Sequence, residues 1–185
     1  MNPLKCAFGV SSGKFLGFLV HSSGIDVDPT KATAITTMRP PATVKEIKSF
    51  LGKVLYIRRF ICGLASITSA FTKLLRKGQS FEWGEAQQTA FKRLQRIMMN
   101  LSMVQALIHK KPLLLYMATN SYAIGPLIAQ EDGGSVEQSV YHICHALKVA
   151  ETRYPKAEIA CLAIMYASQR LRHYFLAYEI GRAHV

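Results

Sequence analysis

A strongly amphipathic segment, Thr43–Ile61 (TVKEIKSFLGKVLYIRRFI), constrains the fold of this chain more than any other feature. Thr43 followed three residues later by Glu46 is a capping box, in which each side chain pairs with a free amide of the first helical turn. Apolar residues then recur at helical spacing: Val44, Ile47, Phe50, Leu51, Val54, Leu55, Phe60 and Ile61. The segment is therefore predicted to form one helix of about five turns with a continuous apolar stripe.

The opposite face of this helix is basic. It carries one acid against five cations, namely Lys45, Lys48, Lys53, Arg58 and Arg59. Such a face can lie on phosphates, on an anionic membrane or simply on water. Residues 1–111 hold 17 of the 23 lysines and arginines but 5 of the 11 acids, whereas residues 112–185 hold six of each. A basic part joined to a neutral part suggests two modules, the first of which faces a polyanion.

Composition excludes several other classes of protein. Half of the residues are apolar, which is enough for a core, but no run of about 18 charge-free apolar residues supports a membrane span. The first ten residues lack the apolar core and cleavage site of a signal peptide. The four cysteines, Cys6, Cys62, Cys144 and Cys161, form no C-x-x-C pair and no zinc-like cluster with histidine. They indicate reduced thiols in an intracellular compartment, cytoplasmic or nuclear.

Short elements are predicted on both sides of the amphipathic helix. Residues 6–20 suggest two strands around a turn at Ser11-Ser12-Gly13, and Ser22-Ser23-Gly24 suggests a second turn. Asp28 and Pro29 predict the start of a short helix that reaches about Met38. Further helices are expected over Ser66–Leu75 and Gly84–Met99, followed by an irregular stretch over 100–111.

The character of the chain changes at Pro112. Three strand-like runs follow, with Gly133-Gly134 as the turn between the last two: Leu113–Ala118, Tyr122–Gln130 and Val136–His142. A long helix over about Lys156–Tyr174 closes the series. Three strands followed by a helix are the opening half of an RNase H-type fold, although many α+β domains begin in this order.

Several motifs together resemble the polymerase of gypsy-class LTR retrotransposons. Met1–Val20, Gly24–Lys31, Thr43–Ile61 and Phe81–Leu94 are similar to the stretch from the end of the reverse-transcriptase palm through the thumb. LLLYMATNSYAIGPLIAQEDGG and AETRYPKAEIACLAIMYASQRLRHYF resemble the RNase H-like domain that follows it. The resemblance covers residues 1 to about 179, with its motifs in the family's order.

The resemblance implies an α+β fold with an end-of-palm β-hairpin, a helical thumb and a truncated RNase H-like domain of three antiparallel strands and a long helix. The implied divisions are residues 1–38 (palm end and palm–thumb connection), 39–111 (thumb and helical connection), 112–179 (RNase H-like domain) and 180–185 (a tail outside the family pattern). Phe15, Leu16, Gly17 and Phe18 match the primer grip, and Thr43–Ile61 matches the thumb helix that follows a duplex backbone. Packing of Phe15 and Phe18 in the hairpin core is an equal alternative to grip function.

The catalytic carboxylates of the family are missing from this sequence. Phosphoryl transfer at two Mg²⁺ ions needs acidic ligands, and the paired-aspartate motif of the polymerase precedes the part that Met1 matches. In the nuclease pattern, Ala118 stands where the first catalytic Asp belongs and Ala160 where the catalytic Glu belongs. Glu158 lies two residues earlier, about 200° away around a helix. We therefore expect no enzyme activity and no bound cofactor, whereas the intact family enzyme uses Mg²⁺.

The sequence therefore predicts a polyprotein fragment whose remaining role is weak, sequence-independent binding of an RNA/DNA hybrid or duplex through the thumb. Two alternatives stay open: a structural tether that docks onto the remaining polymerase domains without nucleic-acid contact, and, least favoured, an RNase H nuclease. A decayed copy without function is also compatible with the substitutions. Pro126 favours distortion of the second strand, and the missing later strands would leave the edge of the sheet open.

Overall fold

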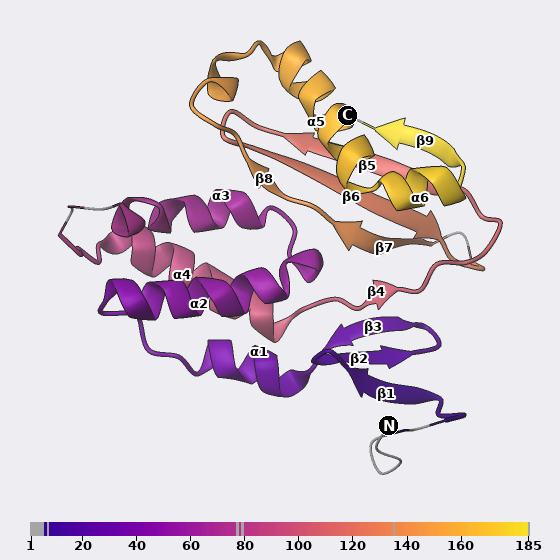
Figure 1. The fold of residues 1–185 in the computed structure, drawn as a ribbon, viewed down its shortest axis with the longest axis horizontal. Coiled ribbons are helices and arrows are strands. Elements are labelled where there is room, and N and C mark those ends of the chain that lie inside the picture. Colours follow the sequence, from indigo (N-terminus) through magenta and orange to yellow (C-terminus); the bar gives the residue numbers. More distant parts are fainter. Residues whose placement is uncertain (1–5, 7, 77, 79, 135, 185) are drawn as a thin grey trace.

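The computed structural model describes residues 6, 8–76, 78, 80–134 and 136–184 of the 185-residue chain. Its architecture is α+β (Figure 1): four helices beside a small sheet form one part, and a second sheet covered by two helices forms the other. Each part has its own cluster of buried apolar side chains. All four cysteines are free thiols, and no helix in the described ranges has the length and apolarity to cross a bilayer.

The first sheet has the order β1-β2-β3-β4 and is antiparallel throughout. Its strands are β1 (Ser12–Phe15), β2 (Phe18–His21), β3 (Gly24–Val27) and β4 (Val104–Gln105). Leu16 and Gly17 join β1 to β2 with φ angles of 49° and 75°, the positive values that a two-residue hairpin turn requires. The turn predicted at Ser11–Gly13 is therefore wrong, because Ser12 and Gly13 already pair with β2.

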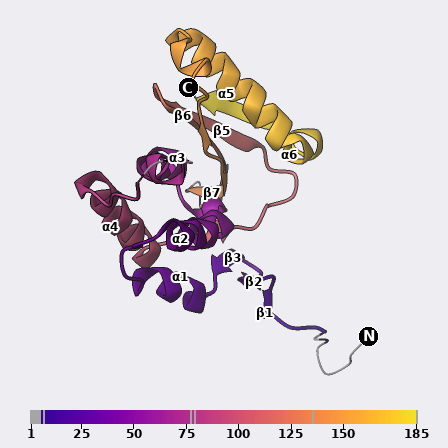
Figure 2. The same cartoon turned by 60° about the vertical axis from the view of Figure 1, so that its left-hand side comes forward.

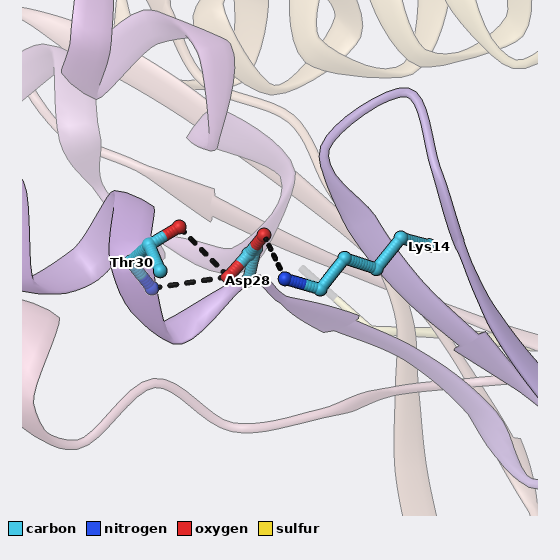
Figure 3. Close-up of polar contacts among 3 residues, drawn as sticks. All are labelled: Lys14, Asp28 and Thr30. Atoms are coloured by element: carbon cyan, nitrogen blue, oxygen red, sulfur yellow. Dashed lines mark hydrogen bonds and ion pairs between the residues drawn. The ribbon is translucent and has the colours of Figure 1, made fainter.

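Helix α1 (Pro29–Thr36) begins at the predicted cap. The carboxylate of Asp28 accepts hydrogen bonds from the amide (3.0 Å) and hydroxyl (2.9 Å) of Thr30, and Lys14 of β1 pairs with its other oxygen at 3.1 Å (Figure 3). The helix ends two residues before the predicted Met38. There the side-chain amide of Gln95 donates to the carbonyl oxygens of Thr36 (2.9 Å) and Met38 (3.1 Å).

Helix α2 spans Val44–Tyr56, and Thr43 caps it as predicted by accepting the amide of Glu46 at 3.2 Å. Glu46 in turn accepts from the amide of Ala42 at 2.8 Å, one residue before the expected partner. The predicted continuation of the helix to Ile61 is wrong. Ile57 ends α2 and a 3₁₀ turn follows over Arg58–Phe60, because this change of direction buries both Ile57 and Phe60 in the core (0% and 6% exposed).

The remaining helical part packs around aromatic rings. Its elements are α3 (Leu64–Thr68), two 3₁₀ turns (Ser69–Phe71 and Lys73–Leu75) and α4 (Glu85–Met99). The single helix predicted for Ser66–Leu75 is thus three short turns, whereas α4 matches its predicted range. Phe50 contacts Phe71 and Phe91 with ring centroids 5.9 Å and 5.0 Å apart. Trp83 stacks on Phe71 at 5.8 Å, so α2, the 3₁₀ turn and α4 share one core.

The connection between the two parts is more ordered than the irregular stretch predicted for 100–111. Strand β4 completes the first sheet beside β3 (Figure 1). The fully buried side chain of Gln130 fastens the residues that follow. It accepts from the amide of Ile108 at 2.7 Å and donates to the carbonyl oxygens of Ile108 (3.0 Å) and Lys111 (2.9 Å). These bonds fix the connection against the second sheet.

The second sheet has the order β7-β6-β5-β9, with β8 pairing β6. The elements of this part are β5 (Leu113–Thr119), β6 (Ala123–Glu131), β7 (Glu137–His142), β8 (His145–Ala146), a 3₁₀ turn (Glu151–Arg153), α5 (Lys156–Arg170), α6 (Arg172–Ala177) and β9 (Ile180–His184). Helix α5 lies across one face of the sheet (Figures 1 and 2), where Ile159, Ala163 and Ala167 meet the buried side chains of β5 and β6. The three predicted strands are confirmed. The predicted long helix is divided at Leu171.

Two expectations about this sheet are wrong. The edge of β5 is not open, because β9 pairs with it in parallel. Pro126 does not distort β6, which stays paired with β5 on both sides of the proline. The carbonyl of Pro126 accepts from Ile143 at 2.8 Å, and in a strand the amide and carbonyl of one residue point the same way. Pro126 has no N–H, so this pair keeps one of the two hydrogen bonds that an antiparallel pair exchanges, and the loss falls at the break between β7 and β8.

Candidate nucleic-acid interface

Helix α2 presents an exposed stripe opposite its buried residues, Ile47, Phe50 and Val54. At 100° per residue, six of its exposed positions fall within about 140° of the helix circumference, and the exposed Glu46 and Leu55 flank this arc. We call this surface the α2 stripe; its members are Lys45, Lys48, Ser49, Gly52, Lys53 and Tyr56, all exposed. The lysines flank two small residues, and the Cβ position of Gly52 meets no atom within 4 Å. A ligand can therefore approach the helix backbone closely between positive charges.

The α2 stripe continues onto α1 and the β1–β2 hairpin. Lys31, Ser49, Gly52, Lys53 and Tyr56 line a groove of about 380 Å³ between α1 and α2. At the hairpin turn, a Cβ on Gly17 would lie 2.5 Å from the hydroxyl oxygen of Tyr56 and 3.6 Å from Cε of Lys31. The turn thus rests on the end of the stripe, and hairpin and helix form one surface.

The four hairpin residues predicted as a primer grip differ in whether they are exposed or packed against α2. Phe15 and Leu16 are exposed (66% and 74%) and Gly17 supplies the turn. Phe18 is half-buried and stacks on Tyr56 with centroids 4.9 Å apart and planes 5° apart. Phe18 therefore fixes the hairpin to α2, which is the packing alternative, whereas Phe15 and Leu16 remain available to a ligand.

The five predicted cations do not share one face. Lys45, Lys48 and Lys53 lie on the α2 stripe, but Arg58 and Arg59 follow the end of α2 and point elsewhere. The guanidinium of Arg59 lies 5.4 Å from the ring centroids of both Phe18 and Tyr141, so it joins the hairpin to β7. Arg58 lines a cleft against the second sheet. A single basic face over Thr43–Ile61 is thus wrong, because the helix ends at Tyr56.

The charge of the α2 stripe is not neutralised by nearby acids. Within the described residues, no ion pair involves any of its three lysines. Glu46, the one acid of α2, is hydrogen-bonded to the amide of Ala42. Asp28 is committed to Thr30 and Lys14; its hydrogen bonds from Thr30, followed by the one from Lys14, hold the pKa of this carboxyl below its usual value. The surface therefore retains a local positive potential.

The positions matched to the nuclease acids lie in the second part of the molecule. Ala118 lines a small cavity with Cys62, Gly63 and Ser66 near the start of α3. Ala160 is half-buried on α5, and Glu158 is exposed near the start of that helix. The described residues contain no group of three His, Cys, Asp or Glu side chains that could hold a metal ion. The residues present therefore do not fit the Mg²⁺ pair of the intact enzyme.

Some members of the surface were not singled out from the sequence. Lys31 comes from another helix, and no local pattern connects it to α2. Ser49, Gly52 and Tyr56 do carry a signal, since their spacing of three and four residues from Lys45, Lys48 and Lys53 puts them on the same helix face. They carry no charge, so a pattern of basic residues does not include them.

Comparison with known proteins identifies the family. Residues 83–181 match the family model of the RNase H-like domain found in reverse transcriptase. The chain is 32% identical to the retrovirus-related Pol polyprotein from transposon opus of Drosophila melanogaster, covering 94% of this chain and 18% of that protein. It is 24% identical to the transposon Tf2-3 polyprotein of Schizosaccharomyces pombe, covering 94% and 13%. The chain thus spans less than a fifth of the length of these relatives.

Solved structures show the same fold. The foamy viral protease-reverse transcriptase in complex with RNA/DNA hybrid superposes with a TM-score of 0.74 at 17% identity, covering 90% of this chain and 22% of that one. The complex of the same viral protein with dsDNA superposes with a TM-score of 0.73 at 16% identity, covering 91% of this chain and 35% of that one. The α+β architecture is therefore that of reverse transcriptases and their RNase H-like domains. The match over more than half of its residues shows that the chain belongs to the family of RNase H-like domains found in reverse transcriptase.

Proposed function

We propose that this chain is part of a gypsy-class retrotransposon Pol polyprotein and binds nucleic acid through its thumb. In this assignment residues 1–38 are the palm end, 39–111 the thumb and helical connection, 112–179 the RNase H-like domain and 180–185 a tail. The order of hairpin, helices and mixed sheet supports it, as do the transposon relatives. The proposed ligand is an RNA/DNA hybrid or duplex, bound weakly and without sequence preference.

The observation that carries this proposal is the α2 stripe with its uncompensated lysines and small residues. Sequence-independent binding uses phosphate contacts rather than base edges, and ammonium groups on flexible stems adapt to many backbone geometries. Ser49 and Gly52 leave room for a sugar–phosphate backbone between Lys48 and Lys53. Leu16 and Gly17 extend the contact surface from the adjoining hairpin.

Charge reversal on the α2 stripe tests the proposal. The hybrid affinity of the full chain is measured by fluorescence anisotropy between 50 and 200 mM salt, for Lys48→Glu with Lys53→Glu and for the control pair Lys92→Glu with Arg93→Glu. The control residues are exposed on α4, so both double variants change net charge equally. For the α2 variant alone, we expect the hybrid affinity to fall roughly tenfold or more. We also expect its slope of log affinity against log salt concentration to become shallower by about two. Equal loss in both would mean general attraction to a basic protein.

We further propose that the RNase H-like domain has no nuclease activity. Support comes from Ala118 and Ala160 at the positions of two catalytic acids and from a donor set that does not fit two Mg²⁺ ions. Incubation of the chain with a labelled hybrid and Mg²⁺ or Mn²⁺ should give no more cleavage than a Glu158→Ala variant gives. Cleavage that Glu158→Ala abolishes would restore the nuclease hypothesis.

A structural tether is the second candidate, and the position of Arg59 favours it. Its guanidinium lies between Phe18 of the hairpin and Tyr141 of β7, so one side chain joins the palm end to the RNase H-like domain. A tether would dock onto the remaining polymerase domains and would bind no hybrid. Reversal of Lys48 and Lys53 would then leave docking unchanged, and no hybrid binding would be there to lose.

A further inference from the structure

A cleft separates the helical part from the RNase H-like part, on the side of α2 away from the groove with α1. It encloses about 210 Å³. Its walls come from the end of α2, α3, β7 with the residues after it, and α5. Two arginines, one histidine and two tyrosines line it beside mostly apolar residues: Arg58, Arg170, His142, Tyr141 and Tyr166.

Among the residues that the structure describes, no acid lines this cleft. The ion pairs of the described residues are Lys14–Asp28, His21–Asp26 and His145–Glu151, so neither Arg58 nor Arg170 has a carboxylate partner there. Both arginines are exposed at the mouth of the same cleft, so an anion seated in it would be attracted by two positive charges.

The two arginines differ in how far their side chains are already held in place for such an anion. Arg170 is oriented by Tyr166, since its Nε donates to the Tyr166 hydroxyl at 3.4 Å and its guanidinium carbon lies 5.8 Å from the ring centroid. Its terminal amino groups remain available as donors. Arg58 is exposed, and its side chain forms no hydrogen bond or ion pair with another described residue. A guanidinium fork matches the oxygens of phosphate better than any other side chain does.

His142 supplies a third donor without adding charge. Its side chain is half-buried at the end of β7 and forms no hydrogen bond with the rest of the described chain. Burial lowers the pKa of its imidazole, so the neutral ring offers one N–H donor at neutral pH. The cleft therefore combines two positive forks, one neutral donor and aromatic walls.

We propose that this cleft binds a phosphate group, held by Arg58 and Arg170 with His142 as a third donor. The site is separate from the α2 stripe and does not depend on duplex binding there. The phosphate can belong to a nucleic-acid backbone that passes between the two parts, or to a free nucleotide or phosphate ion. The same oxyanion chemistry serves both sources.

Thermal melting of the full chain with inorganic phosphate tests the site, with chloride at matched ionic strength as reference. At phosphate about tenfold above its Kd, we expect the midpoint to rise by roughly 3 °C. Arg58→Gln with Arg170→Gln should abolish the rise, whereas Lys48→Glu with Lys53→Glu should retain it. The double arginine variant also removes the contact between Arg170 and Tyr166, which could unfold the protein. Arg58→Gln alone avoids this problem, because the exposed Arg58 side chain makes no such contact, and it should also abolish the rise. A rise that the arginine variants retain, or no rise at all, would overturn the proposal.

The two sources are separated with a nucleoside 5′-monophosphate and a short RNA/DNA hybrid as probes. A backbone phosphate predicts that Arg58→Gln weakens hybrid binding about tenfold while the lysines of the α2 stripe are intact. A free ligand predicts unchanged hybrid affinity and a loss of monophosphate binding in the same variant. If Arg58→Gln leaves the affinity for both probes unchanged, the cleft is not a phosphate site.

Discussion

At the scale of single residues, two glycines near the proposed interface have opposite physical reasons to be glycine. Gly17 has a φ of +75° and its Cβ position lies 2.5 Å from the hydroxyl of Tyr56, so the turn requires a residue without a side chain. Gly52 sits in the middle of α2 with nothing within 4 Å of its Cβ position. The fold does not need a glycine there, whereas the proposed close approach of a ligand backbone would be served by one.

Alanine substitution distinguishes these two roles. Gly17→Ala should lower the free energy of unfolding by about 2 kcal/mol, because an L residue is strained in the left-handed region and the new methyl meets Tyr56. Gly52→Ala should raise it by about 0.5–1 kcal/mol, because alanine is the better helix former. Yet Gly52→Ala should weaken hybrid binding if a backbone lies on the α2 stripe. Urea melts and anisotropy measure the two quantities, and unchanged affinity would argue against close approach at Gly52.

Asp28 links β1 to the start of α1, and its contribution depends on pH. Its hydrogen bonds from Thr30, followed by the one from Lys14, lower the pKa of its carboxyl in the folded state. The resulting stabilisation is present above the unfolded pKa of about 3.9 and is lost as pH falls through the lower folded value. Melts of wild type and Asp28→Asn should differ constantly above about pH 5 and converge at lower pH. A difference that does not change down to pH 2 would exclude this role for the carboxylate.

At the scale of elements, the sequence predicts cores and caps better than it predicts ends. The apolar periodicity of Thr43–Ile61 identifies α2 correctly and Thr43 caps it, but the same periodicity continues beyond the point where the helix stops. Ile57 and Phe60 fit a longer helix equally well in sequence. Only packing against the core of the helical part selects the 3₁₀ turn over Arg58–Phe60. For this reason the placement of Arg58 and Arg59 could not be predicted, although that of the three lysines could.

The connection to the second sheet depends on one buried amide. Gln130 makes three hydrogen bonds to backbone groups of Ile108 and Lys111 and is 0% exposed. Gln130→Leu leaves one amide and two carbonyls unpaired, so we expect the free energy of unfolding to fall by about 3 kcal/mol. The control Gln169→Leu changes an exposed glutamine of α5 and should stay within about 0.5 kcal/mol. Similar denaturant midpoints for both variants would contradict the role given to Gln130.

At the scale of the whole molecule, the edge of the second sheet at β5 is covered by a strand that the sequence pattern does not identify. The strand-like runs at β5, β6 and β7 can be recognised in the sequence, which predicts all three strands. Strand β9 is a short run without a strong pattern, and it pairs in parallel with β5, a contact between segments more than sixty residues apart in sequence. Local patterns carry no information about such pairing, which is why an open edge was expected.

Removal of residues 180–185 should expose the edge of β5. The unpaired N–H and C=O groups of an edge strand form a template for pairing with another chain. We therefore expect the truncated chain to associate in a concentration-dependent manner in sedimentation experiments, to a greater extent than the full chain. Equal sedimentation of the two at all concentrations would show that β9 does not protect this edge.

We propose above that this chain binds nucleic acid through phosphate contacts. Thermal melting followed by circular dichroism, with and without a short RNA/DNA hybrid at low and at high salt, tests it most directly. Binding to the folded state alone raises the midpoint, and salt abolishes the rise when phosphate contacts carry the affinity. We predict a cooperative melt whose midpoint rises with hybrid at low salt and returns to its original value at high salt. A cooperative melt that the hybrid never shifts would contradict nucleic-acid binding and leave the tether as the better account.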